Sequence, residues 1–236
     1  MGNSFYKPGE ERAAKVNDLF AKIAPRYDLI NDLQSFGLHR YWKRRVIALA
    51  NLQPGERAVD VCCGTGDIAL RLGATGAAVV GLDFSKPMLD VARSRGEAGK
   101  RNPKFLEGDA QNLPFDDSTF DVATVGYGLR NLASWERGLE EMWRVTKPGG
   151  RLLVLDFGKP DSGLWRSLYF GYLRWAVPVF GKLFCGDSAT HAYILESLKS
   201  YPAQRGVAEK MRRLDCKNVR VVSFLGGVMS INYAEK

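Results

Sequence analysis

The chain has 236 residues, of which 45% are hydrophobic and 25% are charged. This composition excludes wholesale disorder, and the length suits one α/β domain with a sizeable core. The 34 basic residues outnumber the 26 acidic ones, for a net charge of +8. Such a surplus favours anionic partners such as nucleic acid, acidic lipid headgroups or phosphorylated substrates, but it is equally compatible with a solubilising surface.

The N-terminal region carries charges from Lys7 onward and has no apolar segment typical of a secretory signal, so we expect a cytoplasmic protein. Apolar residues then recur at helical spacing up to about Leu52, with breaks near Pro25 and Gly37. Residues 1–52 are therefore predicted to form a helical segment that precedes the sheet.

From Arg57 onward, short β-branched runs alternate with helical stretches. This pattern predicts βαβ units and a mostly parallel sheet with right-handed connections. The five runs are RAVDVC, AAVVGLD, KFLEGD, FDVATVG and RLLVLDFG. The sequence KPGG at residues 147–150 predicts a turn between a helix at residues 134–145 and the fifth strand.

Residues 160–200 contain no strand signal and many aromatic side chains, which predicts a helical insertion. The last two strands are expected at roughly VRVVSFLG and GVMSINYAE. We therefore expect a single domain. Its parts are the helical segment 1–52, a cofactor-binding core at 53–159, the insertion 160–200, and a last helix with two strands at 201–236.

The stretch DVCCGTGD at residues 60–67 joins the first predicted strand to the next helix, at the sheet edge where ligands bind in open α/β folds. Gly64 and Gly66 allow a tight turn and a close approach of a ligand, and Thr65 and the helix N-terminus offer N–H groups. Asp83 follows Gly66 by 17 residues at the end of the second strand. A carboxylate there is placed to accept hydrogen bonds from both hydroxyl groups of a ribose.

The turn departs from the fingerprint of dinucleotide-binding proteins. Ala69 replaces the third glycine of G-x-G-x-x-G, and Cys62 stands where an extended glycine pattern would begin. Asp67 at the mouth of the helix would repel a phosphate. It would suit a ligand with a positive charge, such as an ammonium or a sulfonium.

The third strand ends in GDAQNLPF at residues 108–115, which places Asp109 and Ala110 on the same rim. Asp109 can accept a hydrogen bond from an exocyclic amine such as that of adenine. Each acid of this rim alone could cap a helix or lie in a solvated loop. The set consists of Asp60, Asp67, Asp83 and Asp109. Together these acids favour S-adenosylmethionine, which has a ribose, an adenine and a sulfonium but no phosphate.

Four cysteines are present, and they show no CxxC pair and no Cys/His spacing of the kind that zinc requires. They are Cys62, Cys63, Cys185 and Cys216. We therefore predict no metal site. Cys62 and Cys63 are expected to be small buried residues that pack under the turn without a redox role.

Motifs along nearly the whole chain resemble the class I S-adenosylmethionine methyltransferases, and more narrowly the ubiquinone/menaquinone biosynthesis C-methyltransferase family. The matching stretches are FAKIAPRYDLINDLQSFGLHRYWKRRV (20–46), VDVCCGTGD (59–67), GDAQNLPFDDSTFD (108–121), GYGLRNL (126–132), RVTKPGGRLLVLDF (144–157) and GGVMSINYAEK (226–236). The resemblance implies a Rossmann-like sheet of seven strands with the last strand antiparallel. The helical segment 1–52 then acts as an N-terminal lid.

The resemblance also implies S-adenosylmethionine-dependent methylation of a ring carbon of a polyprenylated quinol. The substrate would be demethylmenaquinol, giving menaquinol, or the equivalent benzoquinol of the ubiquinone pathway. By position, the implied cofactor contacts are Thr65, Asp83, Asp109, Ala110 and Gly126, although relatives often carry Ser at the last site. Gly64, Gly66 and Phe84 complete the predicted cofactor-binding set.

Another small-molecule methyltransferase or a nucleic-acid methyltransferase is the alternative. The basic surplus permits the second, but amino-methylating enzymes of nucleic acids usually place an Asn/Asp-Pro-Pro-aromatic tetrapeptide after the fourth strand. GYGLRNL stands there instead, so we expect no nucleic-acid partner. A module that senses the cofactor would bind it without consuming it.

Methylation of a ring carbon requires that a neighbouring quinol hydroxyl lose its proton. For a phenol with a pKa of about 10, this costs about 4 kcal/mol at pH 7. Arg130 and Asn131 are our catalytic candidates because a guanidinium and a hydrogen-bond donor stabilise the anion. The alternative for Arg130 is a surface loop residue.

Tyr27, the third catalytic candidate, belongs with Asp28 and Asn31 to the predicted lid that excludes water. The alternative is that these three residues only cap helices. His39 is left unassigned, because a base and a helix-end backbone contact are both compatible with its position.

Residues 164–184 form an aromatic segment of 21 residues, long enough to span a membrane as one helix. Arg174 near its centre and Pro178 argue against a span. Trp165, Tyr169 and Tyr172 begin an apolar stripe, with a kink expected at Pro178. This stripe either packs on the sheet or binds a membrane surface. We expect peripheral association with the inner face of the membrane, and a homodimer is possible.

Overall fold

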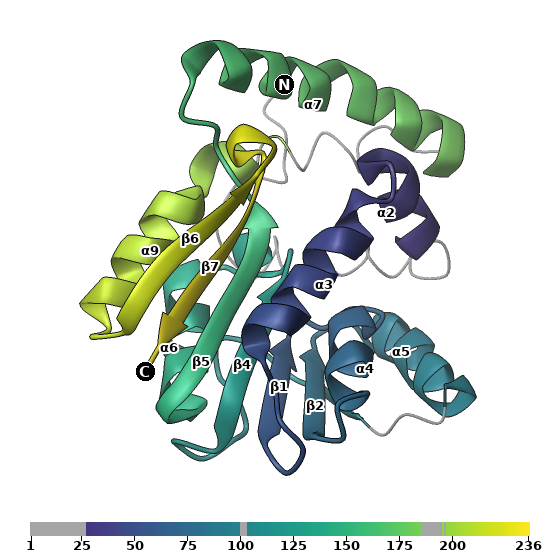
Figure 1. Ribbon diagram of the computed structural model, residues 1–236. Helices are drawn as coiled ribbons and strands as arrows, with labels where there is room; N and C mark the ends of the chain where they lie inside the picture. Colours follow the sequence, from purple (N-terminus) through teal and green to yellow (C-terminus); the bar gives the residue numbers. More distant parts are fainter. Residues whose placement is uncertain (1–26, 100–102, 186–194, 196) are drawn as a thin grey trace.

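Figure 1 shows the computed structural model, which describes residues 27–99, 103–185, 195 and 197–236. Helices predicted before residue 27 lie outside the described residues. The described part of the chain forms a seven-stranded sheet in the order β3-β2-β1-β4-β5-β7-β6. Strand β7 runs antiparallel to its neighbours β5 and β6, and all the other pairs are parallel. The predicted fold class is confirmed.

The strands begin and end close to the predicted runs. Their bounds are β1 Arg57–Val61, β2 Ala78–Asp83, β3 Lys104–Glu107, β4 Phe120–Gly126, β5 Thr146–Phe157, β6 Lys217–Phe224 and β7 Met229–Glu235. The helices are α2 Tyr27–Ser35, α3 Leu38–Ala50, α4 Asp67–Gly73, α5 Lys86–Ala98, α6 Trp135–Val145, α7 Gly163–Cys185 and α9 Ala203–Arg213. Short 3₁₀ helices are η2 Leu129–Asn131 and η3 Leu225–Gly227.

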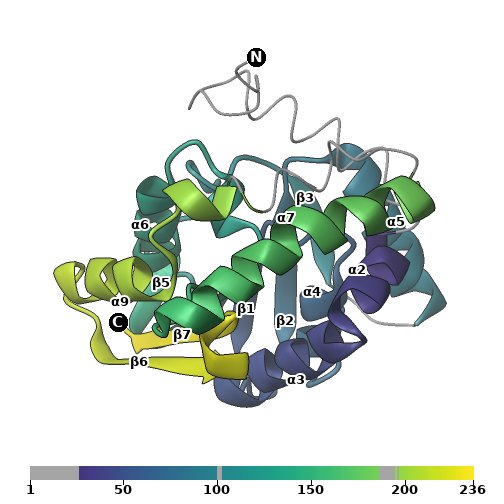
Figure 2. The ribbon, with the colours of Figure 1, turned by 90° about the horizontal axis from the view of Figure 1, so that it is seen from above.

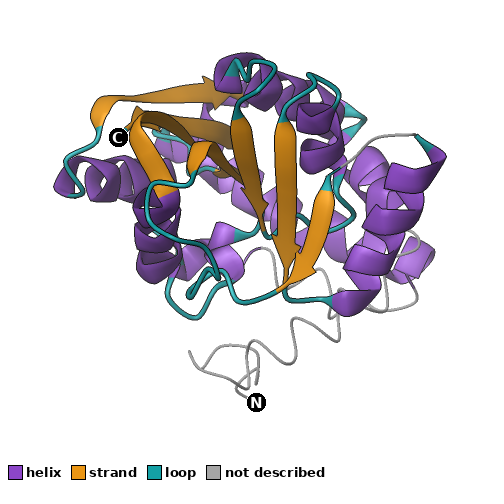
Figure 3. Ribbon diagram, turned by 90° about the horizontal axis from the view of Figure 1, so that it is seen from below, coloured by secondary structure: helices purple, strands orange, loops and turns teal. Residues whose placement is uncertain are grey.

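Helices cover both faces of the sheet, and the strands lie between them (Figure 3). Alternate strand residues point to opposite faces, so Ala58 packs in one core with α3, α4 and α5. The next residue, Val59, packs in the other core with α6 and α9. A parallel sheet is stable only when both of its faces are buried. This explains the nearly continuous apolar runs in its strands.

Glycine and serine set two helix boundaries. Gly37 has a φ of 75° between α2 and α3, a left-handed conformation that side chains disfavour, and this confirms the predicted break. Ser134 caps α6 by accepting a hydrogen bond from the backbone N–H of Arg137. The loop between β3 and β4 is tied to the same helix, because buried Glu141 accepts a hydrogen bond from the Leu113 N–H at 2.8 Å.

The predicted turn at KPGG lies inside a strand. Thr146 pairs with Phe120, and Arg151 pairs with Val122, so residues 147–150 bulge out of the ladder. The bulge is held because Gly149 donates to the backbone oxygen of Lys236 at 2.7 Å, and the Lys236 N–H donates back to Gly150. Pairing with the last residue of the chain therefore extends β5 back to Thr146.

The aromatic segment forms α7, which lies across one end of the sheet and contacts α2 (Figures 1 and 2). The helix continues past Pro178 to Cys185. Among the described residues, no helix combines the length and the apolar character that a membrane crossing needs.

The predicted aromatic stripe of α7 packs against the protein. Tyr169 is buried, the Tyr172 hydroxyl donates to the backbone oxygen of Gln34, and the Trp165 indole donates to the backbone oxygen of Leu225 at 2.8 Å. Trp165 is nevertheless 42% exposed, and Leu164, Leu168 and Trp175 are further exposed apolar side chains of α7. The later side chains of the predicted stripe lie outside the described ones, so the structure shows the protein-facing role only for its first turns.

Candidate active site

A cavity opens at the carboxyl ends of β1, β2 and β4, where ligands bind in open α/β sheets. Eight of the eleven predicted site residues line it. They are Tyr27, Gly64, Asp83, Phe84, Asp109, Ala110, Gly126 and Asn131. The lining does not include Thr65, Gly66 or Arg130. The structure therefore brings most of the predicted set together, from segments as distant as α2 and the loop after β4.

Asp83 at the end of β2 organises the turn after β1. One carboxylate oxygen accepts a hydrogen bond from the Gly64 N–H at 2.7 Å, and the other accepts one from the Ser85 N–H at 2.8 Å. Burial raises the pKa of Asp83, although these backbone donors favour its charged form. Each oxygen keeps a second lone pair that can accept from a ligand in the cavity.

The loop after β3 supplies the neighbouring part of the rim. Asp109 accepts a hydrogen bond from the Gln111 N–H at 2.9 Å, which fixes the carboxylate at the cavity edge. Ala110 beside it is buried and packs with Leu82 in the core. A small side chain at this position leaves room for a flat ligand against the sheet.

Asp60 and Gly66 have structural roles beneath the turn. Asp60 is buried, accepts a hydrogen bond from the Thr124 hydroxyl at 2.7 Å, and accepts another from the Ala69 N–H in the first turn of α4. Gly66 has a φ of 80°, and a Cβ there would lie 2.9 Å from the ring of Phe105. Asp60 therefore fixes the start of α4, as the alternative interpretation of the rim acids allowed.

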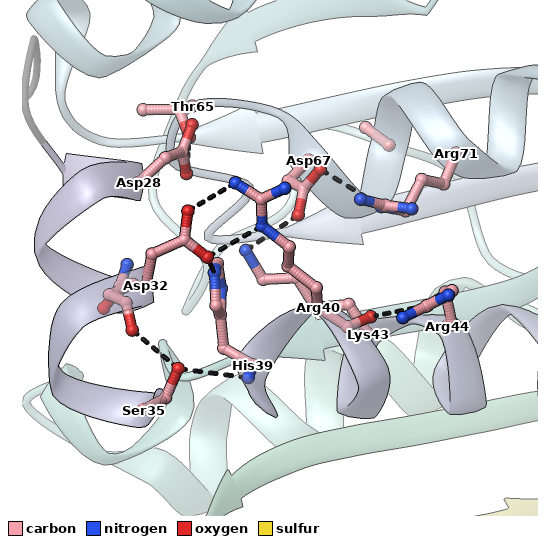
Figure 4. Close-up of polar contacts among 12 residues, drawn as sticks. Asp28, Asp32, Ser35, His39, Arg40, Lys43, Arg44, Thr65, Asp67 and Arg71 are labelled. Atoms are coloured by element: carbon pink, nitrogen blue, oxygen red, sulfur yellow. Dashed lines mark hydrogen bonds and ion pairs between the residues drawn. The ribbon is translucent and has the colours of Figure 1, made fainter. Parts of the chain in front are cut away.

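The prediction that Asp67 favours a cationic ligand is wrong, because the carboxylate already has three cationic partners. Lys43 lies 2.9 Å away, Arg71 3.1 Å and Arg95 3.5 Å. Burial alone would raise the pKa of Asp67, but these cations bring it down to about 2. Figure 4 shows Asp67 with its partners Lys43 and Arg71 at the junction of α2, α3 and α4. The charge at the helix mouth is therefore compensated from within the protein.

Thr65 and His39 take part in the same corner of the structure. The Thr65 hydroxyl donates to Asp28 at 3.2 Å, and the Thr65 side chain lies outside the lining of the cavity. The Nε2 atom of buried His39 lies 2.7 Å from an oxygen of Asp32, and burial lowers the pKa of its imidazole. His39 thus joins α3 to α2 through a side-chain contact, and its ring does not line the cavity.

Arg130 is buried behind the cavity wall, with 6% of its surface exposed, so the alternative of a surface loop residue is wrong. Its guanidinium lies 3.7 Å from Asp156 and 4.9 Å from the ring centre of Phe157. One nitrogen donates to the Tyr127 backbone oxygen at 2.7 Å and to the side-chain oxygen of Asn131 at 3.1 Å. Arg130 therefore reaches the cavity only through its neighbours.

Tyrosines form the polar part of the wall near Asn131. The Tyr27 side chain is hydrogen-bonded to Asn31, and burial raises the pKa of its phenol. Tyr127 was missed by the sequence analysis. Its hydroxyl is buried and has no hydrogen-bond partner among the residues that the structure describes. The sequence did contain a signal for Tyr127, because it lies between Gly126 and Gly128 directly after β4. Residues that follow the strand ends form the rim of the site.

Cys62 lines the cavity in addition to packing beneath it, while Cys63 lies behind the turn. Burial raises the pKa of both thiols well above the ordinary value. Both side chains are therefore neutral thiols at pH 7, and a buried neutral thiol is a poor nucleophile and a poor redox group. This agrees with the packing role expected of them.

The ubiE/COQ5 methyltransferase family matches residues 8–236 of this sequence. The chain belongs to that family. A demethylmenaquinone methyltransferase of Desulfitobacterium hafniense (strain Y51) is 39% identical over 228 residues, which cover 94% of this chain and 90% of that protein. A Staphylococcus aureus (strain MRSA252) protein of the same name is 38% identical, with 94% of each chain covered.

Among solved structures, an S-adenosylmethionine-dependent methyltransferase of Thermotoga maritima, described as a possible histamine N-methyltransferase, is similar with a TM-score of 0.63. The alignment covers 93% of this chain and 99% of that one at 21% identity, so it bears on the fold alone. Family and fold together confirm the resemblance seen in the sequence. The protein is an S-adenosylmethionine-dependent methyltransferase.

Asp60 makes the stability of the fold depend on pH. Burial raises its pKa to about 7 against the hydrogen bonds from Thr124 and Ala69. The folded protein thus keeps a proton that the unfolded chain loses above about pH 4, so Asp60 lowers the free energy of unfolding as the pH rises from about 4 to about 7. Asp60→Asn removes this titration. Between about pH 5 and pH 7.5, we expect urea unfolding to show a loss about 2–3 kcal/mol larger in the wild type than in this variant. Equal losses would contradict the assignment.

Proposed function

We propose that the protein transfers a methyl group from S-adenosylmethionine to a ring carbon of a polyprenylated quinol, converting demethylmenaquinol to menaquinol. The observation that carries the proposal is that one cavity combines the carboxylates of Asp83 and Asp109 with the polar wall of Tyr27, Tyr127 and Asn131. The names of the relatives support this choice of substrate. The names of the relatives give less support to the corresponding benzoquinol as the acceptor. It serves as the comparison substrate in the test.

The rim residues are the proposed cofactor contacts. Asp83 lines the cavity, and its carboxylate, which accepts hydrogen bonds from backbone N–H groups of the turn, is placed to accept also from the two ribose hydroxyls. Asp109 is placed to accept from the adenine amine, and the exposed ring of Phe84 is available to cover the base. Gly64 and Gly126 let the ligand approach the backbone. Thr65 and Gly66 contribute by fixing the turn.

The wall near Asn131 is the proposed acceptor side. Methyl transfer forms a bond from the ring carbon to the methyl carbon and breaks the methyl–sulfur bond, and the ring carbon then loses its proton. Arg130 donates to the side-chain oxygen of Asn131, which orients the amide so that its NH₂ group points away from the guanidinium. One amide hydrogen is directed to the Tyr127 backbone oxygen at 3.3 Å. The Asn131 amide lines the cavity and is the proposed donor to the quinol oxygen as negative charge develops there.

Tyr27 is the proposed cover of the site. It begins α2, lines the cavity beside Gly64 and Gly126, and presents a phenol whose raised pKa keeps it protonated at pH 7. A neutral hydroxyl at this place donates a hydrogen bond and excludes bulk water from the reacting carbon. We place it with Asn131 among the groups that touch the acceptor.

The function is tested with purified protein, reduced demethylmenaquinone and S-adenosylmethionine labelled with ¹³C in the methyl group. We expect menaquinone with the label on its ring, detected by mass spectrometry. The matching benzoquinol should react more slowly. Binding of the cofactor without formation of any methylated quinone would contradict the proposal and favour another methyl acceptor.

The two sides of the cavity should respond differently to substitution. Asp83→Asn weakens hydrogen bonds to a charged acceptor, so we expect about a tenfold to hundredfold rise in the KM for S-adenosylmethionine. Asn131→Leu removes the donor to the developing anion and should lower kcat about a hundredfold with little change in that KM. Steady-state kinetics and thermal melts check both. Asp90→Ala, an exposed change on α5, is the matched control. If Asn131→Leu strongly raised the KM for S-adenosylmethionine, Asn131 would belong to the cofactor side of the cavity. Its assignment to the acceptor side would then be wrong.

Membrane association is proposed from the outer face of α7. Trp175 is 71% exposed, and Phe36 at the α2–α3 corner is 78% exposed. Leu164 and Leu168 add two exposed apolar side chains on the same helix, and the guanidinium of Arg174 lies 5.4 Å from the Trp175 ring centre. Exposed aromatic and aliphatic side chains with adjacent arginines suit the interface of an acidic bilayer.

The doubly substituted variant Leu168→Glu/Trp175→Glu should lose most of its flotation with vesicles that contain phosphatidylglycerol. Its activity on a quinol with a short, water-soluble side chain should not change. Leu106→Glu on β3 serves as the control for adding a carboxylate to an exposed leucine. If the double variant floats like the wild type, the outer face of α7 does not bind the membrane.

A further inference from the structure

Asp28 and Tyr27 are adjacent residues in the first turn of α2, but their side chains contact different parts of the molecule. Tyr27 lines the cavity, whereas the Asp28 carboxylate contacts the turn after β1 and helix α5. Figure 4 shows Asp28 beside Thr65, which belongs to that turn. The position of Tyr27 in the cavity is therefore tied to the contacts that Asp28 makes.

One guanidinium joins these segments. Arg95, in the last turn of α5, donates to Asp28 at 2.7 Å. The same nitrogen donates to the backbone oxygen of Thr65 at 3.0 Å and to its hydroxyl at 3.1 Å. A second nitrogen of Arg95 lies 3.5 Å from Asp67. Arg95 thus bridges α2, the cofactor turn and the start of α4.

The two parts of this bridge differ in their exposure to solvent. Lys43 is buried, and Asp67, which pairs with it at 2.9 Å, exposes only 13% of its side chain, so this part of the network is largely shielded from solvent. Asp28 and Arg95 keep about a third of their side chains exposed, 35% and 34%. Ion pairs in such positions are weak and are screened by salt. The contact between Asp28 and Arg95 is therefore the part of the network that can open.

Helix α2 has little apolar packing to hold it in place. Ile30 is its one buried residue among those that the structure describes, and Leu29 points to solvent. The far end of the helix is held by Asp32, which contacts His39 and Arg40 of α3. At the end that carries Tyr27, the Asp28 carboxylate contacts the turn after β1 and helix α5. A helix with this distribution of contacts can swing about its far end.

We propose that Arg95 is a positioning residue that latches α2 over the cofactor turn and so controls the escape of the adenosyl ligand. The latch consists of Arg95, Asp28 and Thr65. When it is closed, Tyr27 forms part of the cavity wall; when it opens, the first turn of α2 moves away and the cavity is uncovered. The inference rests on the proposed cofactor contacts, but it assigns a role to two charged side chains outside the cavity lining.

The test compares Arg95→Met with Arg93→Met. Arg93 lies on the same helix but pairs with exposed Asp90, so its loss removes an arginine of α5 without touching the latch. We expect stopped-flow release of S-adenosylhomocysteine to be about threefold to tenfold faster in Arg95→Met, and unchanged in Arg93→Met. Raising NaCl from about 0.05 M to about 0.5 M should speed release from the wild type and not from Arg95→Met, because salt screens the latch. Arg95→Lys should restore part of the slow release.

A double-mutant cycle assigns the effect to the pair. Asp28→Asn alone should speed release as Arg95→Met does, and the double variant should be no faster than either single one. Additive effects would show that the two residues act separately. Wild-type release rates and salt dependence in Arg95→Met would overturn the latch.

Hydrogen exchange without ligand separates the latch from the proposed function. The backbone amides of α2 should exchange faster in Arg95→Met than in Arg93→Met, whatever the protein methylates. If these amides are equally protected in the two variants, the latch is wrong even where methyl transfer is demonstrated. If they differ and the release of S-adenosylhomocysteine changes as expected while demethylmenaquinol is not methylated, the latch stands and the proposed function fails.

Discussion

The hydrogen bonds that fix the turn between β1 and α4 are the constraint on which the rest of the site depends. Asp60 holds the helix side of the turn through the Ala69 N–H, and Asp83 holds the strand side through the Gly64 N–H. Two carboxylates from neighbouring strands thus immobilise a backbone that carries no large side chain. Buried carboxylates are costly unless backbone or hydroxyl donors satisfy them, and both of these are satisfied. The cavity and helix α2 are built on a turn that does not have to be ordered by a ligand.

Local signals in the sequence were enough to predict the sheet and to place Asp83 and Asp109 at the rim of the cavity. Strand ends of a parallel sheet converge on one edge, so Asp83 and Asp109 were found from their position alone. Asp60 and Asp67 look the same in the sequence, yet their partners come from distant segments. Thr124 lies 64 residues beyond Asp60, and Lys43 and Arg95 come from helices on either side of α4 in the chain. No local pattern separates an acid that lines the cavity from one whose charge is already neutralised by other residues.

The faces of α7 show a second limit on what can be predicted from the sequence. Helical spacing identified a stripe that begins with Trp165 and Tyr169, but the helix is also apolar elsewhere, at Leu168 and Trp175. When both sides of a helix carry large apolar residues, periodicity gives the faces without saying which one the protein covers. The answer depends on where α2 lies, because Tyr172 donates to a backbone oxygen of that helix. Tertiary contacts of this kind are not encoded within the segment itself.

The surroundings of Arg130 bear on how an ionised quinol is stabilised. The guanidinium faces Asp156 at 3.7 Å, so much of its field is cancelled before it reaches the cavity, and burial in turn raises the pKa of that carboxyl. A net positive charge at the wall is therefore a weaker contribution than the sequence suggested. The oriented dipole of the Asn131 amide, held by Arg130, lies directly on the cavity and needs no rearrangement during the reaction. In the proposed reaction, preorganised dipoles and the positioning of the two bound partners would then supply most of the stabilisation, and the geometry of the loop after β4 would matter more than its charge.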